Sequence, residues 1–220
     1  MVTQEPQPLP ELRRSPRELD ARPLLVLAAA VEERHPDLAD HGDRVADLAT
    51  EVGRRLGLGR AQVGRLRLAA RLHDVGKVAV PQEILDKPGR LDADEWRQME
   101  RHPEVGAQLL ASSNLDALAP IVEAHHERPD GTGYPHRLTG ADIPLEALII
   151  GAADAFDAMV SARPYRRPLT TAAALAELDR GAGTQFDPQI ASALHDSIVA
   201  RDGNRGRRFV ARARATAAVY

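Results

Sequence analysis

The 220-residue sequence contains no cysteine, few aromatic residues and no long hydrophobic run. Without cysteine there can be no disulfide bond and no thiolate zinc site, so any metal ion would be held by histidine, aspartate, glutamate and water. Those ligands suit manganese and iron as well as zinc. Aromatic residues make up only 3% of the chain, so the core must be aliphatic. The abundant alanine, leucine, arginine and glutamate favour helices.

The longest apolar run, PLLVLAAAV at residues 23–31, is too short to cross a bilayer. The first residues also lack a basic start followed by an apolar stretch, which argues against a signal peptide. The formal net charge is −3, so no overall field attracts nucleic acid polymers or an anionic membrane. We therefore expect a cytoplasmic protein without a membrane span.

The length and the composition predict one domain between two tails. Residues 1–22 are rich in proline and charge, which is typical of a disordered tail. Residues 23–200 form the expected domain, without a linker or an internal repeat. Residues 201–220 contain six arginines, which indicates a solvated basic tail or, alternatively, a weak docking site for a partner, lipid or nucleic acid.

Apolar spacing predicts helices through most of this domain. Val45, Leu48 and Val52 follow a helical stripe that ends before Gly57. Asp92 is placed to cap a helix, and Pro103 fits the first turn of the next one. The expected helices cover residues 41–56, 61–73, 92–99, 103–110, 117–127, 144–161, 171–180 and 188–200. Since no segment alternates as a strand would, the predicted fold class is all-α.

Four polar residues occupy helix faces that should bury aliphatic side chains: Asp37, His41, His73 and Asp154. Buried carboxylates and imidazoles are costly unless they are paired or bind a metal. Each histidine alone could be a hydrogen-bonded core or surface residue. The pattern of five histidines at helix ends and faces favours a metal centre, and it comprises His41, His73, His102, His125 and His126.

Two adjacent histidines, His125 and His126, carry a geometric implication. Neighbours on a helix point about 100° apart, so one small ion would rarely use both of them. Two ions a few Å apart could take one each, and a bridging carboxylate such as Asp74 fits that arrangement. Lysine usage adds a second hint, because Lys77 and Lys87 are the only lysines. Lys77 follows Asp74 by three residues, whereas Lys87 in KPGRL has the context of an ordinary loop residue.

Several motifs together identify a family. HDVGK at residues 73–77 is the signature of HD phosphohydrolases, and it is joined by LDKPGRL, RHPEVG, HHERPDGTGYP, IPLEALIIGAADAFDAM, RPYRRPL and GTQFDP. This ordered set, from about residue 25 to 200, resembles an HD-GYP domain. The resemblance implies a single HD-type helical bundle with short added helices.

The resemblance also implies roles for individual residues. Asp74 and Lys77 would be catalytic, with Asp74 bridging two ions and Lys77 near the scissile phosphate. The implied metal ligands are Asp37, His41, His73, Asp74, His102, His125, His126 and Asp154. The implied substrate-binding residues are Lys77, Gly133, Tyr134, Pro135, Arg163 and Arg166. The implied cofactors are two or three divalent ions, iron or manganese, and Asp37 replaces the glutamate of members with three ions.

Two positions depart from the family's loop pattern. Pro129 stands where an aromatic residue is usual, and Arg137 stands where glycine is usual. Proline stiffens the loop, and arginine disfavours a positive φ at that position. Asp157, one turn after Asp154, has two readings: an exposed helix residue, which we expect, or a carboxylate that orients a ligand histidine.

The resemblance implies a phosphodiesterase that hydrolyses cyclic di-GMP to pGpG, GMP or both through a metal-activated hydroxide. One alternative is an HD-family phosphohydrolase of another cyclic dinucleotide or nucleotide. The other is a cyclic di-GMP-binding signalling module with little turnover. Regulation by a separate partner of the GGDEF or sensor type and a constitutive enzyme are both open, and so is a homodimer.

Overall fold

The computed structural model describes residues 20–34, 40–162 and 167–201, and within them the regular elements are helices. Along the chain they are α1 (Arg22–Arg34), α2 (His41–Arg55), α3 (Arg60–Leu72), η2 (Val75–Ala79), α4 (Gln82–Leu85), α5 (Ala93–Met99), α6 (His102–Ser112), η3 (Asp116–Leu118), α7 (Ala119–Glu123), η4 (Gly140–Asp142), α8 (Leu145–Val160), α9 (Thr171–Gly181) and residues 188–201. The described residues form no β-strand beyond isolated bridges. The all-α prediction is confirmed.

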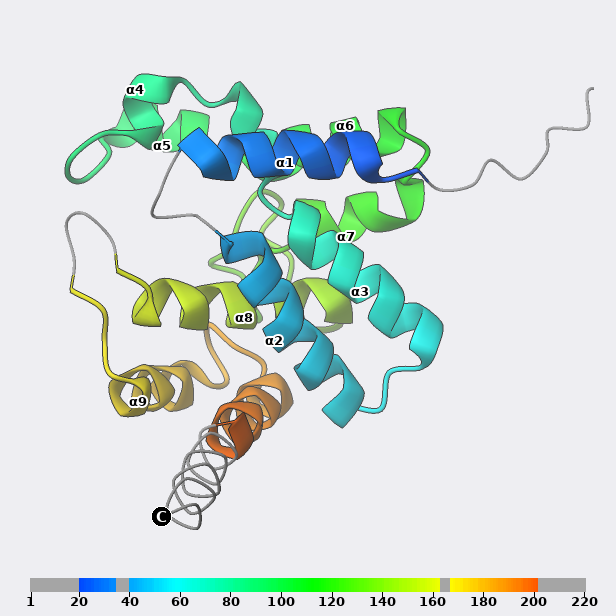
Figure 1. The fold of residues 1–220 in the computed structure, drawn as a ribbon. Helices are drawn as coiled ribbons and strands as arrows, with labels where there is room; N and C mark the ends of the chain where they lie inside the picture. Colours follow the sequence, from blue (N-terminus) through cyan, green and yellow to red (C-terminus); the bar gives the residue numbers. More distant parts are fainter. Residues whose placement is uncertain (1–19, 35–39, 163–166, 202–220) are drawn as a thin grey trace, which may run out of the picture.

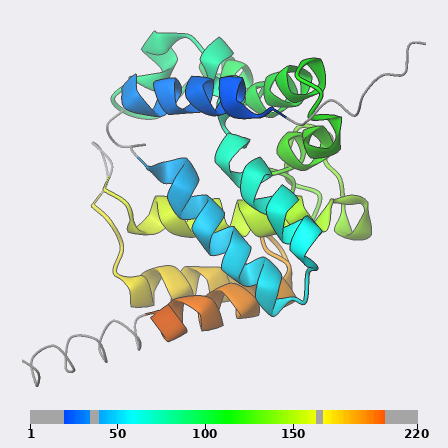
Figure 2. The ribbon, with the colours of Figure 1, turned by 45° about the vertical axis from the view of Figure 1, so that its right-hand side comes forward.

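The helices form a bundle around α2 and α8. α2 packs against α3 and crosses α8 in the middle of the molecule (Figure 1). α1 lies over one end of this centre against η2 and α3, and α6 packs beside it against η2 and α7. α9 and the helix at residues 188–201 close the opposite end, which Figure 2 shows from a second side.

The core is aliphatic, as the composition predicts, apart from Phe156 and Phe186. The predicted stripe of α2 is buried: Val45 and Val52 are fully covered and Leu48 nearly so. Each such side chain contributes about 1.5–3 kcal/mol through removal from water. The last described helix is fastened to α2, because the Nε of Arg201 lies 2.5 Å from the Oε2 of Glu51.

Local signals set several helix ends where the sequence predicts them. The side chain of Asp92 accepts hydrogen bonds from the backbone N–H groups of Asp94 and Glu95, at 2.9 and 3.0 Å. Pro103 occupies the first turn of α6, and Gly57 leaves α2 with a positive φ of 80°. Among the described residues no helix has the length and apolar character that a bilayer crossing requires.

Candidate metal centre

The polar residues singled out in the sequence converge where α2, α3, η2, α6 and α8 meet. His41 begins α2, His73 caps the end of α3, and His102 begins α6. His125 and His126 follow α7 directly, and all of these except His126 are at least 97% buried. Asp74 opens η2, and Asp154 points from α8 toward His41, with its Oδ1 3.2 Å from the Nε2 of His41. Asp37, Arg163 and Arg166 lie outside the described residues.

Three of these imidazoles are held in the same way. In each, Nδ1 lies within hydrogen-bond distance of a backbone carbonyl three residues earlier, which fixes the tautomer with Nδ1–H as donor. The pairs are His73 with Ala70 at 2.7 Å, His102 with Met99 at 2.8 Å and His125 with Val122 at 2.5 Å. Each Nε2 is thereby left with a free lone pair directed into the cluster.

His41 is held by a carboxylate instead. Its Nδ1 lies 2.8 Å from the Oδ2 of Asp157, and Asp157 also accepts hydrogen bonds from Arg44 at 2.7 and 2.9 Å. Asp157 is buried, so the prediction of an exposed helix residue is wrong. The cause is long-range, because α2 covers this turn of α8. Asp157 instead orients the ring of His41, which was the second interpretation of Asp157.

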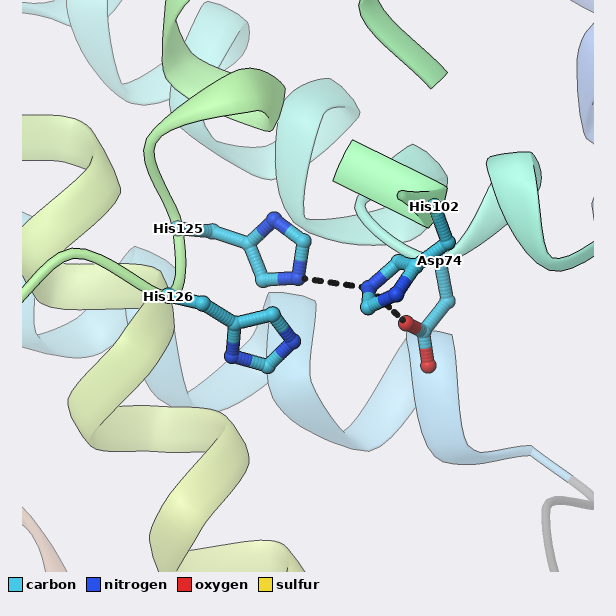
Figure 3. A group of neighbouring side chains, drawn as sticks. All are labelled: Asp74, His102, His125 and His126. Atoms are coloured by element: carbon cyan, nitrogen blue, oxygen red, sulfur yellow. Dashed lines mark hydrogen bonds and ion pairs between the residues drawn. The ribbon is translucent and has the colours of Figure 1, made fainter. Parts of the chain in front are cut away.

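The cluster divides into two groups of donors that share Asp74. One group is Asp74, His102, His125 and His126, and the other is His41, His73 and Asp74, with the donor atoms of each group within 4.8 Å of one another. In Figure 3 the rings of His125 and His126 point toward His102 and Asp74. The two oxygens of Asp74 face different groups: Oδ1 lies 3.3 Å from His102 Nε2, and Oδ2 lies 3.4 Å from His73 Nε2.

The donor atoms fit a bound cation. The Nε2 atoms of His102 and His125 lie 3.4 Å apart, and with both Nδ1 protons committed, two lone pairs face each other. A metal ion holds imidazole nitrogens at about 2.0–2.1 Å, so both nitrogens are within reach of one ion. The Nε2 of His73 is buried and has no hydrogen-bond partner among the described residues. A bound metal ion would satisfy buried lone pairs of this kind.

The protonation states suit metal ligands. Burial and the neighbouring imidazole of His102 lower the pKa of His126 to about 3. Burial and the imidazoles around it likewise hold the pKa of His125 well below its usual value. Burial opposes ionisation of Asp74, yet Lys77 and the adjacent histidines hold its pKa well below its usual value. Neutral imidazoles and ionised carboxylates are the forms that bind metals.

His41 differs from these rings. Burial favours its neutral form, but hydrogen bonding to Asp154 and Asp157 outweighs burial and raises its pKa to about 9. The carboxylates that stabilise a proton on His41 would equally stabilise a metal cation beside its Nε2.

The adjacent histidines do not lie on a helix. α7 ends at Glu123 and a turn follows, so the prediction of a helix through residue 127 is wrong. The two rings come within 4.0 Å of each other, centroid to centroid, tilted by 41°. Both belong to the donor group of Asp74 and His102, so their assignment to different ions stays a prediction.

Two glycines allow the backbones to close around the cluster. A Cβ on Gly76 would lie 1.9 Å from the carbonyl oxygen of His102, and one on Gly151 would lie 2.6 Å from that of His125. Real side chains cannot occupy such space, so only glycine lets η2 approach α6 and α8 approach the histidine turn. The role of Gly76, which lies inside η2, is therefore close packing.

The loop that contains Gly133, Tyr134 and Pro135 lies against this cluster. The ring of Tyr134 stacks on His126 at 4.7 Å. Buried Glu127 fixes the following segment by accepting the backbone N–H groups of His136 at 2.6 Å and Leu138 at 3.0 Å. Arg137 adopts a φ of 56°, so the left-handed conformation is kept despite the arginine, with a strain of about 1–2 kcal/mol.

Lys77 lies inside the centre and Lys87 outside it. The Nζ of Lys77 donates to the Oδ2 of Asp74 at 2.6 Å. Lys87 forms an ion pair with Glu95 at the start of α5, so it fastens the LDKPGRL segment to that helix.

A family model described as HD domain matches residues 25–190. The chain belongs to the HD domain family. The resemblance seen in the motifs is thereby confirmed. HD domains are metal-dependent, and the histidine and aspartate cluster of this one could bind metal.

Curated relatives of this HD domain are larger proteins. The chain is 45% identical over 171 residues to the "Cyclic di-GMP phosphodiesterase response regulator RpfG" of Xanthomonas campestris, covering 76% of the chain and 45% of that protein. It is 39% identical over 187 residues to the "3'3'-cGAMP-specific phosphodiesterase 2" of Vibrio cholerae, covering 84% and 35%. A "Cyclic di-GMP phosphodiesterase" of Thermotoga maritima is 38% identical over 174 residues, covering 78% and 47%. The chain thus spans less than half of each.

Solved structures support the HD fold. Bd1817, an HDG"Y"P protein from Bdellovibrio bacteriovorus, aligns with a TM-score of 0.59 at 24% identity, over 72% of this chain and 51% of that one. The HD domain of the L. monocytogenes phosphodiesterase PgpH aligns with a TM-score of 0.58 at 18% identity, over 83% and 98%. At these identities the likeness concerns the fold.

Sequence reasoning missed several residues of the HD domain's centre. Glu127 follows His126 directly, and that adjacency was the available signal. Arg44, which holds Asp157, lies three residues after His41 and thus close to it on α2. Nothing local to α5 predicts that Trp96 lies near Tyr134, since these residues are far apart in the chain.

Proposed function

We propose that the chain is a metal-dependent phosphodiesterase that hydrolyses cyclic di-GMP to pGpG, GMP or both. The observation that carries this proposal is the sharing of Asp74 by two groups of buried donors. A carboxylate between two metal positions is the arrangement that two-metal phosphoryl-transfer sites use. The names of the relatives from Xanthomonas campestris and Thermotoga maritima supply the substrate.

Two ions would be held by the donors around Asp74. His102 and one of the two adjacent histidines would serve one ion, and His41 and His73 the other, with Asp154 beside His41. The assignment of His125 and His126 to different ions stays a prediction. The nitrogen and oxygen donors suit iron or manganese. A third ion through Asp37 stays a prediction, because that residue lies outside the described part of the chain.

Individual residues would have separate roles in phosphodiester cleavage. Bound ions would lower the pKa of water and withdraw charge from the phosphate. Asp74 would keep the ions together, and Lys77, held at 2.6 Å from Asp74, would place an ammonium beside the phosphate to balance its negative charge. Asp157 would keep His41 in its ligating orientation.

The substrate would enter a cleft of about 400 Å³ beside the donors. His125, His126 and Asp154 line it, together with Gly133 and Tyr134. Pro135 lines a second groove, which shares Gly133 and Tyr134 with this cleft. We assign the Gly133–Pro135 loop to shaping the substrate site. Phosphate binding by Arg163 and Arg166 stays a prediction, since both lie outside the described residues.

A second candidate substrate is 3′3′-cGAMP. It is favoured by the relative from Vibrio cholerae, which is named as specific for that dinucleotide and is 39% identical. Initial rates with cyclic di-GMP, 3′3′-cGAMP and cyclic di-AMP, measured side by side, distinguish these substrates. Tight binding of cyclic di-GMP without product would instead favour a signalling module with little turnover.

The decisive experiment is anaerobic purification with metal analysis, followed by a cyclic di-GMP assay with added manganese or reduced iron. We expect bound metal and formation of pGpG or GMP. The matched variant replaces His73 and Asp74 by alanine, which should abolish hydrolysis and bound metal while circular dichroism stays helical. Full activity in that variant would refute the assignment.

Partners and location follow from the same proposal. A GGDEF-type or sensor protein would regulate the domain, and the homodimer remains a prediction that light scattering would test. A cytoplasmic location, tested by fractionation, is expected of an enzyme whose substrate is an intracellular dinucleotide. Of the predicted tails, residues 1–19 and 202–220 lie outside the described residues. The disorder of the N-terminal tail and the solvated or docking character of the basic C-terminal tail therefore stay predictions.

A further inference from the structure

Trp96 occupies a position that core packing does not explain. It is the only tryptophan in the chain, and it lies on α5, a helix that buries none of its residues. Trp96 is 45% exposed, although an indole is among the largest apolar surfaces that a side chain offers. Because core packing does not account for this exposed indole, a ligand that contacts it at the surface would explain its position.

The location of Trp96 relates it to the metal centre. It lines the cleft of about 400 Å³ that His125, His126 and Asp154 also line. Tyr134 stands between Trp96 and the donors, since its ring meets the indole edge to face at a centroid distance of 6.3 Å and stacks on His126 at 4.7 Å. The three rings form a continuous aromatic wall from the metal ligands to the mouth of the cleft.

The indole is held in a fixed orientation. Its Nε1 donates a hydrogen bond to the Oε1 of Glu100 at 2.6 Å. α5 itself is fastened by the capping box of Asp92 and Glu95 and by the ion pair of Lys87 with Glu95. A large flat ring that is oriented before binding loses little entropy when another ring stacks on it.

We propose that Trp96 is a stacking platform for a purine base of the substrate. Cyclic dinucleotides present two bases beside their phosphodiesters, so a phosphate at the metal donors leaves a base near the aromatic wall. Arg128 and Gln185 line the same cleft and offer hydrogen bonds to the edge of that base. This inference rests on the proposed function for the identity of the phosphodiester, but not for the stacking of a base.

Steady-state kinetics of two variants test the platform. Trp96→Leu keeps an apolar side chain but no aromatic face, and loss of base stacking should raise the KM for cyclic di-GMP about tenfold, with a smaller change in kcat. Trp96→Phe keeps a face and should stay within about threefold of the wild type. Metal content and the thermal midpoint verify that both variants fold. An unchanged KM in Trp96→Leu overturns the proposal.

Fluorescence gives a second readout, because all tryptophan emission comes from Trp96. GMP should quench this emission with saturation, whereas ribose 5-phosphate, which lacks a base, should not. Equal responses to both compounds, or no response to GMP at millimolar concentration, overturn the proposal.

The two hypotheses fail in different ways. If the wild type cleaves no cyclic dinucleotide but GMP still quenches Trp96, the proposed function is wrong and the platform stands. If the wild type cleaves cyclic di-GMP while Trp96→Leu matches it in KM, the platform is wrong and the proposed function stands.

Discussion

The donor cluster and the cleft beside it are built in opposite ways. The histidines of the cluster are buried at the ends of helices, and local carbonyls orient three of the rings. The cleft wall comes from an exposed short helix, α5, and a loop that carries the strained Arg137. Donor geometry is thus set by the packed core, whereas the substrate side is attached to that core at few points.

The largest expected effect comes from closing the space at Gly76. In Gly76→Ala the new Cβ would collide with the backbone of α6, so we expect the free energy of unfolding to fall by about 3 kcal/mol or more and bound metal to be lost. Chemical denaturation measures the change. Gly64→Ala is the control, since nothing lies within 4 Å of a Cβ there, and it should stabilise α3 by about 0.5–1 kcal/mol. Equal stabilities of the two variants would contradict the packing argument.

A smaller effect, on metal affinity, is expected when the carboxylate that orients His41 is replaced. Asp157→Asn keeps the shape but removes the charge that His41 and Arg44 share. Loss of such a supporting carboxylate should weaken metal binding about 10–100-fold. Titration of the metal-free protein with manganese measures this, and Asp47→Asn, which alters an exposed ion pair with Arg67, should bind metal like the wild type. Unchanged affinity in Asp157→Asn would show that His41 needs no support.

On the substrate side we expect changes in KM without loss of metal. Glu127→Gln removes one of the two carboxylate acceptors for the backbone of His136 and Leu138. The unpaired N–H should cost about 1–2 kcal/mol, loosen the loop and raise the KM. Glu123→Gln, which alters a half-exposed pair with His136, should cost less than about 0.5 kcal/mol. Loss of metal in Glu127→Gln would contradict the view that the donor cluster is held independently of the loop beside the cleft.

The smallest expected effect is a gain. Arg137→Gly relieves the positive φ of the loop, but glycine also adds freedom to the unfolded chain. The net stabilisation should be less than about 1 kcal/mol, measurable as a slight rise in the thermal midpoint. A destabilised variant would mean that the arginine side chain contributes contacts that outweigh its backbone strain.

The same contrast explains what the sequence could predict. His41, His73 and Asp154 could be located because a histidine or carboxylate on an apolar helix face is anomalous within its own segment. The burial of Asp157 could not, because it depends on Arg44, more than a hundred residues away. The end of α7 at Glu123 was missed because no glycine or proline follows it before Pro129. The turn there lies against Gly151 of α8, which is distant in the sequence.

The isolation of α5 has a consequence for how such a domain diversifies. Because this helix buries no side chain and is held mainly through its cap and Lys87, substitutions on it carry little cost to the stability of the core. A lineage can therefore explore new ligand preferences through α5 while its metal chemistry stays intact.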